Sequence, residues 1–230
     1  MASKIGERIN QVIDLELKPL LTEAGFEKER KFFRRTVDGR TQVINVWSHP
    51  YANHGNIGRF MVDVGVFHPE FYGYRNDEKM KGQPKIEACA FRLQLKCRSP
   101  ERPEGSWWLL DENSDDAAVA AELAETVCAR GLPWLEMCSD PSRARDHLES
   151  EAQALLSKRS PFFASKALLQ FEIVYFGVDK ARNTLNRLIE LNSRGWFFKW
   201  LSLKGWLFGW PAKKEIHNYL IETGRELGLL

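Results

Sequence analysis

The sequence has no paired cysteines, no long apolar run and no excess of charge of one sign. Its four cysteines form no CxxC pair, which argues against the usual zinc and thiol redox motifs and favours reduced structural thiols. No uninterrupted apolar run approaches the roughly 20 residues of a membrane-spanning helix. Lys plus Arg total 33 against 31 for Asp plus Glu, so the total charge does not favour a polyanionic partner such as nucleic acid.

Signatures of common enzymes are missing as well. The chain contains no GxxxxGKS or GxxxxGKT, GxGxxG, GxSxG or HExxH motif and no EF-hand loop. These absences lean against an enzyme, and we expect neither a cofactor nor a resident metal. Charges at Lys4, Glu7, Arg8 and Asp14 interrupt the stretch where a signal peptide needs an apolar core, so we expect a cytoplasmic protein.

The first part of the chain predicts a helix followed by strands. Apolar residues recur at helical spacing between Ile5 and Leu21, and Pro19 is expected to kink or restart the helix. Gly25 stands where a left-handed residue would cap it.

Strands are predicted at 32–37, 41–48, 59–67 and about 86–97, rich in β-branched and aromatic residues. The first two flank the turn Asp38-Gly39-Arg40, which predicts a hairpin. Residues 69–84 show no clean period and are expected to form a long loop. The fold class expected is therefore α+β, with the N-terminal helix packed on a four-stranded antiparallel sheet.

The second part predicts helices. Acidic residues at 111–116 can cap a helix over about 115–130, which Gly131 is expected to end, with 132–140 as a connector. Further helices are expected from Pro141 to about 158, over 165–176 and 179–192 around Gly177, and over about 212–227. We therefore expect an α+β domain over 1–140 and a helical C-terminal extension over 141–230 that packs on it.

Four groups of residues are candidates for function. The histidines His49, His54 and His68 bracket the second and third strands, but an antiparallel path puts His49 and His68 at opposite ends of the sheet. Exposed loop histidines are therefore the favoured interpretation, and no metal site is predicted.

A polar set on the sheet is the second candidate. Strand alternation places Asn45 and Trp47 on one face of the second strand, with Asp63 and Arg92 on the third and fourth. Such a face can make a ligand platform. The simpler interpretation is an Asp63 to Arg92 ion pair that solvates the outer face, worth under about 1 kcal/mol.

Two surface segments complete the candidates. The basic run of Lys28, Arg30, Lys31, Arg34 and Arg35 is interleaved with glutamates, so a solvated strand entry explains it better than nucleic-acid binding does. The aromatic segment 195–211 has apolar residues on all sides, which favours burial or a protein contact over a membrane surface. Its candidate interaction residues are Trp196, Phe197, Trp200 and Trp206.

The motifs LKPLLTEAGF, FFRR, VINVW, FMVDVGVF and WWLLD resemble those of the bacterial family of domains of unknown function DUF4304. The resemblance covers roughly the first 140 residues and implies a fold, not an activity. Asp63 stands where the family pattern has Asn, and Trp47 where Gln is common.

Two hypotheses of function follow. We favour a non-enzymatic protein-binding or interaction module, of which a toxin-neutralising immunity protein is one type, with self-association through the aromatic segment as a variant. The alternative is an enzyme or small-ligand-binding protein that uses the polar sheet face around Asn45, Asp63 and Arg92. The two differ in whether that face opens on a cleft or is sealed by helices.

Overall fold

The structure is a computed structural model that describes residues 4–48, 57–76, 78–97, 107–158, 162–200 and 210–230. Two compact units divide the chain, Met1–Ser139 and Asp140–Leu230. The first holds the sheet and the second is helical, which confirms the α+β class. The expected packing of the helical part on the first part stays a prediction.

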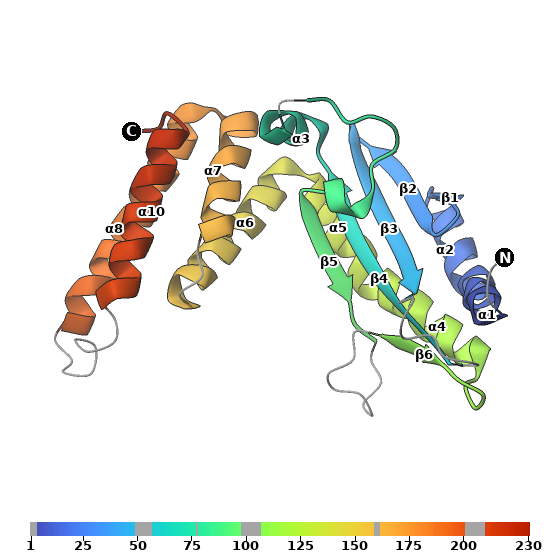
Figure 1. Cartoon of the computed structure of the whole chain (residues 1–230). Helices are drawn as coiled ribbons and strands as arrows, with labels where there is room; N and C mark the ends of the chain where they lie inside the picture. Colours follow the sequence, from blue (N-terminus) through green and yellow to red (C-terminus); the bar gives the residue numbers. More distant parts are fainter. Residues whose placement is uncertain (1–3, 49–56, 77, 98–106, 159–161, 201–209) are drawn as a thin grey trace. The chain divides into compact units, whose positions relative to one another are not determined.

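The sheet of the first unit is antiparallel, with its strands in the order β1-β2-β3-β4-β5, while β6 pairs with β4 (Figure 1). The strands are β1 (Glu27–Glu29), β2 (Phe32–Val37), β3 (Arg40–Ser48), β4 (Gly58–Phe67), β5 (Phe91–Leu95) and β6 (Trp108–Leu110). Four of these are the predicted strands, although the fourth begins at Phe91 and not at about 86, because residues 86–88 form a 3-10 helix. The short strands β1 and β6 are additions that the sequence pattern did not predict.

The hairpin of β2 and β3 is confirmed with a shift of one residue. Arg40 pairs with Val37, so the turn contains only Asp38 and Gly39. Both have positive φ, 47° and 77°, as the favoured two-residue hairpin turn requires. The turn fixes the register that puts Phe33 and Ile44 on the buried face and Asn45 on the other.

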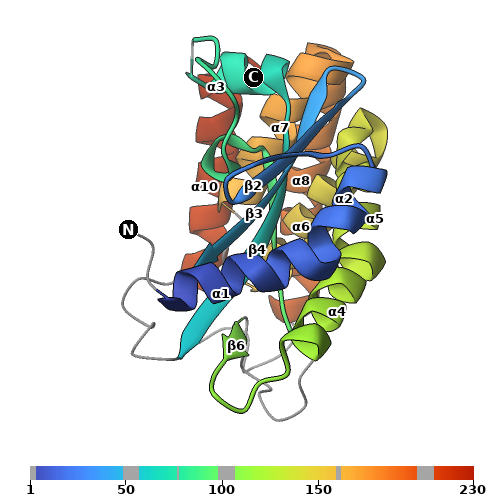
Figure 2. The same ribbon diagram turned by 90° about the vertical axis from the view of Figure 1, so that its right-hand side faces the viewer.

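Helices cover one face of the sheet, here called the inner face. They are α1 (Lys4–Val12), α2 (Lys18–Glu23), α4 (Asp116–Thr126) and α5 (Leu132–Ser139). Figure 2 shows α1 and α2 in front of the strands, with α4 and α5 beside them. Strand β4 turns Phe60, Val62, Val64 and Val66 to this face, all at 0% exposure, because alternate residues of a strand point to the same side.

Two π-helical turns, Ile13–Leu17 and Val127–Gly131, continue these helices through prolines. Each π turn is followed by one residue and then by Pro19 or Pro133. In a regular α-helix a proline ring clashes with the carbonyl four residues before it. A turn widened by one residue relieves that clash without ending the helix.

The expectation that Gly131 ends a helix and that 132–140 is a connector was therefore wrong. Gly131 is buried inside a continuous helical path into α5. A Cβ added to it would lie 3.2 Å from Leu95 Cδ1, so glycine here permits close packing of the helix on the sheet. By contrast, Gly25 has φ 83° and caps α2 as expected.

The predicted loop over 69–84 was also partly wrong, because it contains helix α3 (Pro69–Asn76). This helix buries only Phe71, so it leaves no apolar period in the sequence. A segment that we call the strap, residues 84–90, then crosses the outer face of the sheet and includes a short 3-10 helix at Ile86–Ala88. The strap packs Ile86 and Cys89 against Val43 and Phe67.

Gly65 of β4 allows this crossing. A Cβ at Gly65 would meet Ile86 Cδ1 at 2.7 Å and Cys89 Cβ at 2.9 Å, both closer than real contacts. Any side chain at this position would push the strap off the sheet.

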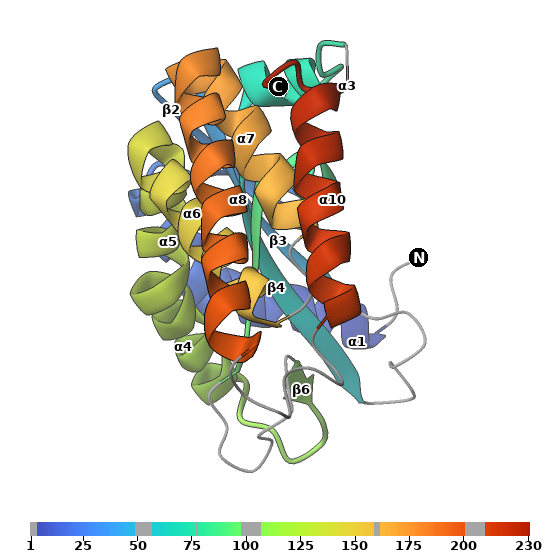
Figure 3. The ribbon, with the colours of Figure 1, turned by 90° about the vertical axis from the view of Figure 1, so that its left-hand side faces the viewer.

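The second unit is formed by α6 (Pro141–Lys158), α7 (Phe162–Phe176), α8 (Val178–Trp200) and α10 (Trp210–Glu226). Figure 3 shows α7, α8 and α10 running alongside one another. Gly177, with φ 88°, separates α7 from α8 as predicted. The core of this unit consists of Leu169, Ala181, Leu185, Leu188, Ile216, Leu220 and Leu229.

A buried charge lies inside the second unit. Glu172 of α7 has 0% exposure, and its Oε1 accepts hydrogen bonds from Arg145 Nε at 2.8 Å and Thr184 Oγ1 at 3.0 Å. Arg145 also pairs with Glu149 on its own helix. The pair joins α6 to α7 through a desolvated contact.

We predict that Gly65→Ala lowers the free energy of unfolding by about 1–3 kcal/mol, because the new methyl group overlaps the strap. Gly73→Ala is the matched control: its Cβ would meet nothing closer than Glu78 O at 3.7 Å, and helical Gly to Ala gains about 0.5–1 kcal/mol. Urea unfolding followed by tryptophan fluorescence measures both. A Gly65→Ala protein as stable as the wild type would contradict the close approach.

We predict that Arg145→Met lowers the free energy of unfolding by about 3–5 kcal/mol, because Glu172 is left buried without its cation. Lys166→Met removes a surface pair with Glu226 and should cost under about 1 kcal/mol. Chemical denaturation measures both changes. If the two substitutions lowered the free energy of unfolding equally, the buried pair would contribute no more to stability than the surface pair.

Candidate functional site

The outer face of the sheet places the predicted polar residues in neighbouring register positions. Asn45 of β3 is opposite Asp63 of β4, which is opposite Gln94 of β5. Arg92 lies two residues from Gln94, opposite Gly65. Because alternate residues share a face, these side chains project to the side away from α1 and α2.

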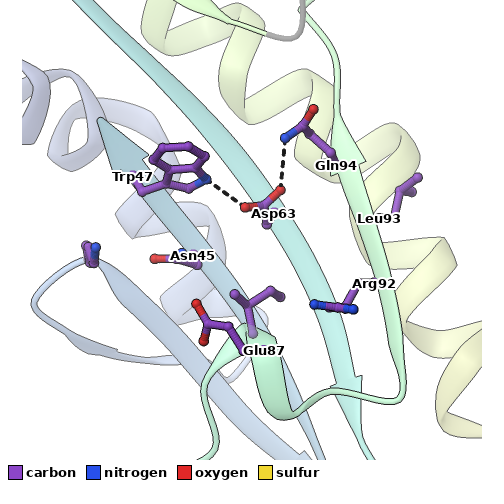
Figure 4. Close-up of a pocket in the computed structure, with 9 residues that line it drawn as sticks. Asn45, Trp47, Asp63, Glu87, Arg92, Leu93 and Gln94 are labelled. Atoms are coloured by element: carbon purple, nitrogen blue, oxygen red, sulfur yellow. Dashed lines mark hydrogen bonds between the residues drawn. The ribbon is translucent and has the colours of Figure 1, made fainter. Parts of the chain in front are cut away.

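A pocket of about 520 Å³ opens on this face. It is lined by Lys31, Asn45, Trp47, Asp63, Ile86, Glu87, Arg92, Leu93 and Gln94 (Figure 4). All four residues predicted for ligand binding, Asn45, Trp47, Asp63 and Arg92, are among them. The outer face is thus hollowed at this point and is not sealed by the helices of the first unit.

The strap forms one wall of the pocket by supplying Ile86 and Glu87. Arg34 Nε of β2 holds the start of the strap by donating to Pro84 O at 2.9 Å. The end is held where Ala90 N–H donates to Val66 O at 3.0 Å. The wall is therefore fixed to the sheet on both sides of Glu87.

Asp63 is held by two neighbours. Trp47 Nε1 donates to Asp63 Oδ2 at 2.7 Å, and Gln94 Nε2 lies 3.4 Å from Asp63 Oδ1 (Figure 4). Trp47 also packs edge-to-face on Trp107, with ring centroids 5.4 Å apart. The carboxylate therefore positions the indole ring that forms this wall.

The predicted ion pair between Asp63 and Arg92 was wrong. Arg92 stands opposite Gly65, two residues along β4 from Asp63, and the indole N–H of Trp47 donates to the Asp63 carboxylate instead. Neither the Arg92 side chain nor the Glu87 side chain makes a hydrogen bond or ion pair with any residue that the structure describes. Both are exposed charges on the pocket wall.

Asn45 is the most unusual member of the site. It is only 5% exposed, and its side-chain oxygen Oδ1 has no hydrogen-bond partner among the described residues. Leaving a buried polar group unpaired costs about 1–3 kcal/mol, so native proteins rarely do so without a reason. The side chain lines the pocket, but Oδ1 itself is enclosed and meets a donor there only after the amide rotates about χ2.

The histidine prediction needs one correction. His49 and His54 lie outside the described residues, but His68 is buried and not the exposed loop histidine expected. Its Nε2 lies 2.9 Å from the carbonyl oxygen of Cys138, to which it donates. Burial lowers the pKa of His68 to about 4, so the ring is neutral at pH 7. Within the described ranges, no group of three or more metal-binding side chains occurs.

The basic run is largely neutralised by carboxylates. Lys28 pairs with Asp14, Arg34 with Glu29, and Arg35 with Glu136. Lys31 instead lies over the ring of Phe32 and on the pocket wall. The run therefore serves the packing of β1 and β2 in this structure.

The predicted interaction surface lies outside the described part of the chain. This applies to Trp206 and to the side chains of Trp196, Phe197 and Trp200. Contact of a partner or a second copy with them stays a prediction. Among the described helices, none is both long enough and apolar enough to cross a membrane.

The first unit is a helix-backed antiparallel sheet with a polar pocket on its outer face. The chain belongs to the family of domains of unknown function DUF4304, whose model matches residues 17–137. No curated protein and no solved structure is significantly similar to the chain. The matched range contains every residue that lines the pocket, so the site lies within the family domain.

Sequence reasoning missed Lys31, Glu87 and Gln94 as pocket residues. Gln94 shares the face that alternation assigned to Arg92, so pairing it with Asp63 would have identified it. No sequence pattern indicated that Glu87 belongs to the pocket, because only the fold of the strap brings this residue over the sheet.

We predict that His68 makes stability depend on acid pH. Its pKa of about 4 in the folded state lies below 6.5 in the unfolded chain, so between these pH values the unfolded chain binds more protons. The free energy of unfolding should fall by up to about 3 kcal/mol as pH drops from 6.5 to 4. His68→Gln should flatten this slope in urea unfolding at pH 7, 5.5 and 4.5; an unchanged slope would assign the acid sensitivity to other groups.

Proposed function

We propose that this chain is a non-catalytic binding protein whose recognition site is the outer-face pocket. The observation that carries the proposal is the unpartnered Oδ1 of the buried Asn45 on the pocket wall. Other buried side chains that the structure describes also carry an unpaired polar atom, and Asn45 is the one among them that lines the pocket, where an outside ligand can supply the missing donor. The pocket volume of about 520 Å³ lies within the range of small-molecule sites.

The remaining polar groups of the pocket suit binding. Arg92 and Glu87 offer opposite charges that no described residue neutralises. Asp63 already accepts from Trp47 and Gln94, so it supports the wall. A carboxylate occupied in this way positions a neighbour better than it removes a proton from a substrate.

Of the two hypotheses drawn from the sequence, the pocket supports small-ligand binding more than protein binding. A protein interface requires a broad patch, typically about 800 Å² per partner. The features found here are instead a concave site with a few convergent polar groups. The immunity-type and self-association versions rest on the aromatic segment and stay predictions.

The proposal predicts opposite effects of two substitutions on one strand. Asn45→Leu should raise the free energy of unfolding by about 1 kcal/mol, because it removes an unpaired buried amide. Gln42→Leu, the matched control on the inner face, should lower it by about 1–3 kcal/mol, because the Gln42 amide is paired with Arg35 and Ser139. Denaturant unfolding compares the two.

The same Asn45→Leu protein should fail to bind. We would screen a panel of polar metabolites against the wild type and follow the indole N–H resonance of Trp47, which reports on the pocket wall. A compound that shifts this resonance in the wild type and leaves the stabler variant unchanged would support the proposal. The proposal fails if no compound shifts it, or if Asn45→Leu destabilises the protein as Gln42→Leu does.

A further inference from the structure

The charges on the pocket wall are balanced, and this indicates the class of ligand. Two cationic side chains, Lys31 and Arg92, and two carboxylates, Asp63 and Glu87, line the pocket. A site for a simple anion has an excess of positive charge, as clusters of Arg and Lys provide. A balanced wall favours a ligand that is itself neutral overall but carries both charges.

Arg92 and Glu87 come from different elements on different sides of the site. Arg92 extends from β5, whereas Glu87 comes from the strap, which packs against β3 at Val43 (Figure 4). They form no ion pair, although they have opposite charge and line the same pocket. A guanidinium binds a carboxylate through two parallel hydrogen bonds, and a carboxylate binds an ammonium group.

Asn45 lies on the Glu87 side of the pocket, on β3. Its Oδ1 requires a donor, and an ammonium group has three, enough to serve both Asn45 and Glu87. Asn45 and Arg92 are on strands separated by β4, so their Cα atoms lie about 10–12 Å apart. Once the side chains extend into that gap, the space left suits a ligand of a few heavy atoms.

We propose that the pocket binds a zwitterion of the α-amino-acid class, with its carboxylate on Arg92 and its ammonium group between Glu87 and Asn45 Oδ1. This inference rests on the proposed function and names its ligand class. Trp47, fixed by its hydrogen bond to Asp63, supplies an apolar surface for the rest of the ligand.

The test titrates the wild type with each of the twenty standard L-amino acids, using the Trp47 indole resonance and calorimetry. For the tightest binder, its N-acetyl derivative lacks the ammonium group and its carboxamide lacks the carboxylate. Each derivative should bind about tenfold or more weakly, because each loses one charge-assisted hydrogen-bonded contact. Acetate and inorganic phosphate, as simple anions, should bind more weakly than the amino acid.

Two exposed residues assign the ends of the ligand. Arg92→Gln should weaken the free amino acid and the N-acetyl derivative about tenfold, and leave the carboxamide unchanged. Glu87→Gln should weaken the free amino acid and the carboxamide, and leave the N-acetyl derivative unchanged. Lys96→Gln, an exposed charge near β5 that does not line the pocket, is the control and should change nothing.

The outcomes separate the two proposals. Binding of another metabolite but of no amino acid overturns the zwitterion and leaves the binding function standing. Phosphate or acetate that binds as tightly as any amino acid makes this an anion site and also overturns the inference. If no compound of either panel binds, both proposals fail.

Discussion

Strand β4 constrains everything else in the first unit, because its two faces must be covered in different ways. Its inner face is a row of bulky apolar side chains that only a layer of helices can bury. On its outer face Gly65 has no side chain, so the strap can cross in direct contact with the backbone of β4 there. The pocket lies where the strap stops covering that face. The same strand thus fixes the core and the position of the candidate site.

Strand β3 carries two buried amides with different surroundings: that of Gln42 is hydrogen-bonded, whereas the Oδ1 atom of Asn45 has no partner among the described residues. Both are buried, but they face opposite sides of the sheet. Gln42 joins Arg35 to Ser139 and so ties β2 to the end of α5. The Oδ1 atom of Asn45 makes no hydrogen bond that would link β3 to another described element. The contacts of Gln42 account for its burial through stability, whereas for Asn45 we propose that a ligand supplies the missing partner.

Local pattern predicted those elements whose signals are local. The Asp38-Gly39 turn, the alternation of β4 and the caps at Gly25 and Gly177 each depend on a few neighbouring residues. The helix through Pro133 could not be predicted in this way, because Pro and Gly normally end helices and only the π turn with sheet packing overrides them. Helix α3 was not predicted, because a helix with a single buried residue shows no helical spacing of apolar residues in its sequence.

The residues of the candidate site also fall into those that local pattern predicts and those that depend on distant parts of the chain. Alternation along three strands was enough to bring Asn45, Trp47, Asp63 and Arg92 to one face. The partner of Asp63 was not predictable, since the indole N–H of Trp47, two residues along β3 from Asn45, takes the same carboxylate. Glu87 depends on the path of the strap, which Arg34 and Gly65 determine from far away in the sequence.

The two π turns also bear on how the family changes in length. Each is one residue longer than the helical turn it replaces, and each lies just before a proline whose ring the wider turn accommodates. A relative without proline at position 19 or 133 has no need of the extra residue. Within the range that the family model matches, a deletion is therefore expected inside the helix before Pro133, where an alignment would ordinarily forbid a gap, and it would keep the buried stripe in phase.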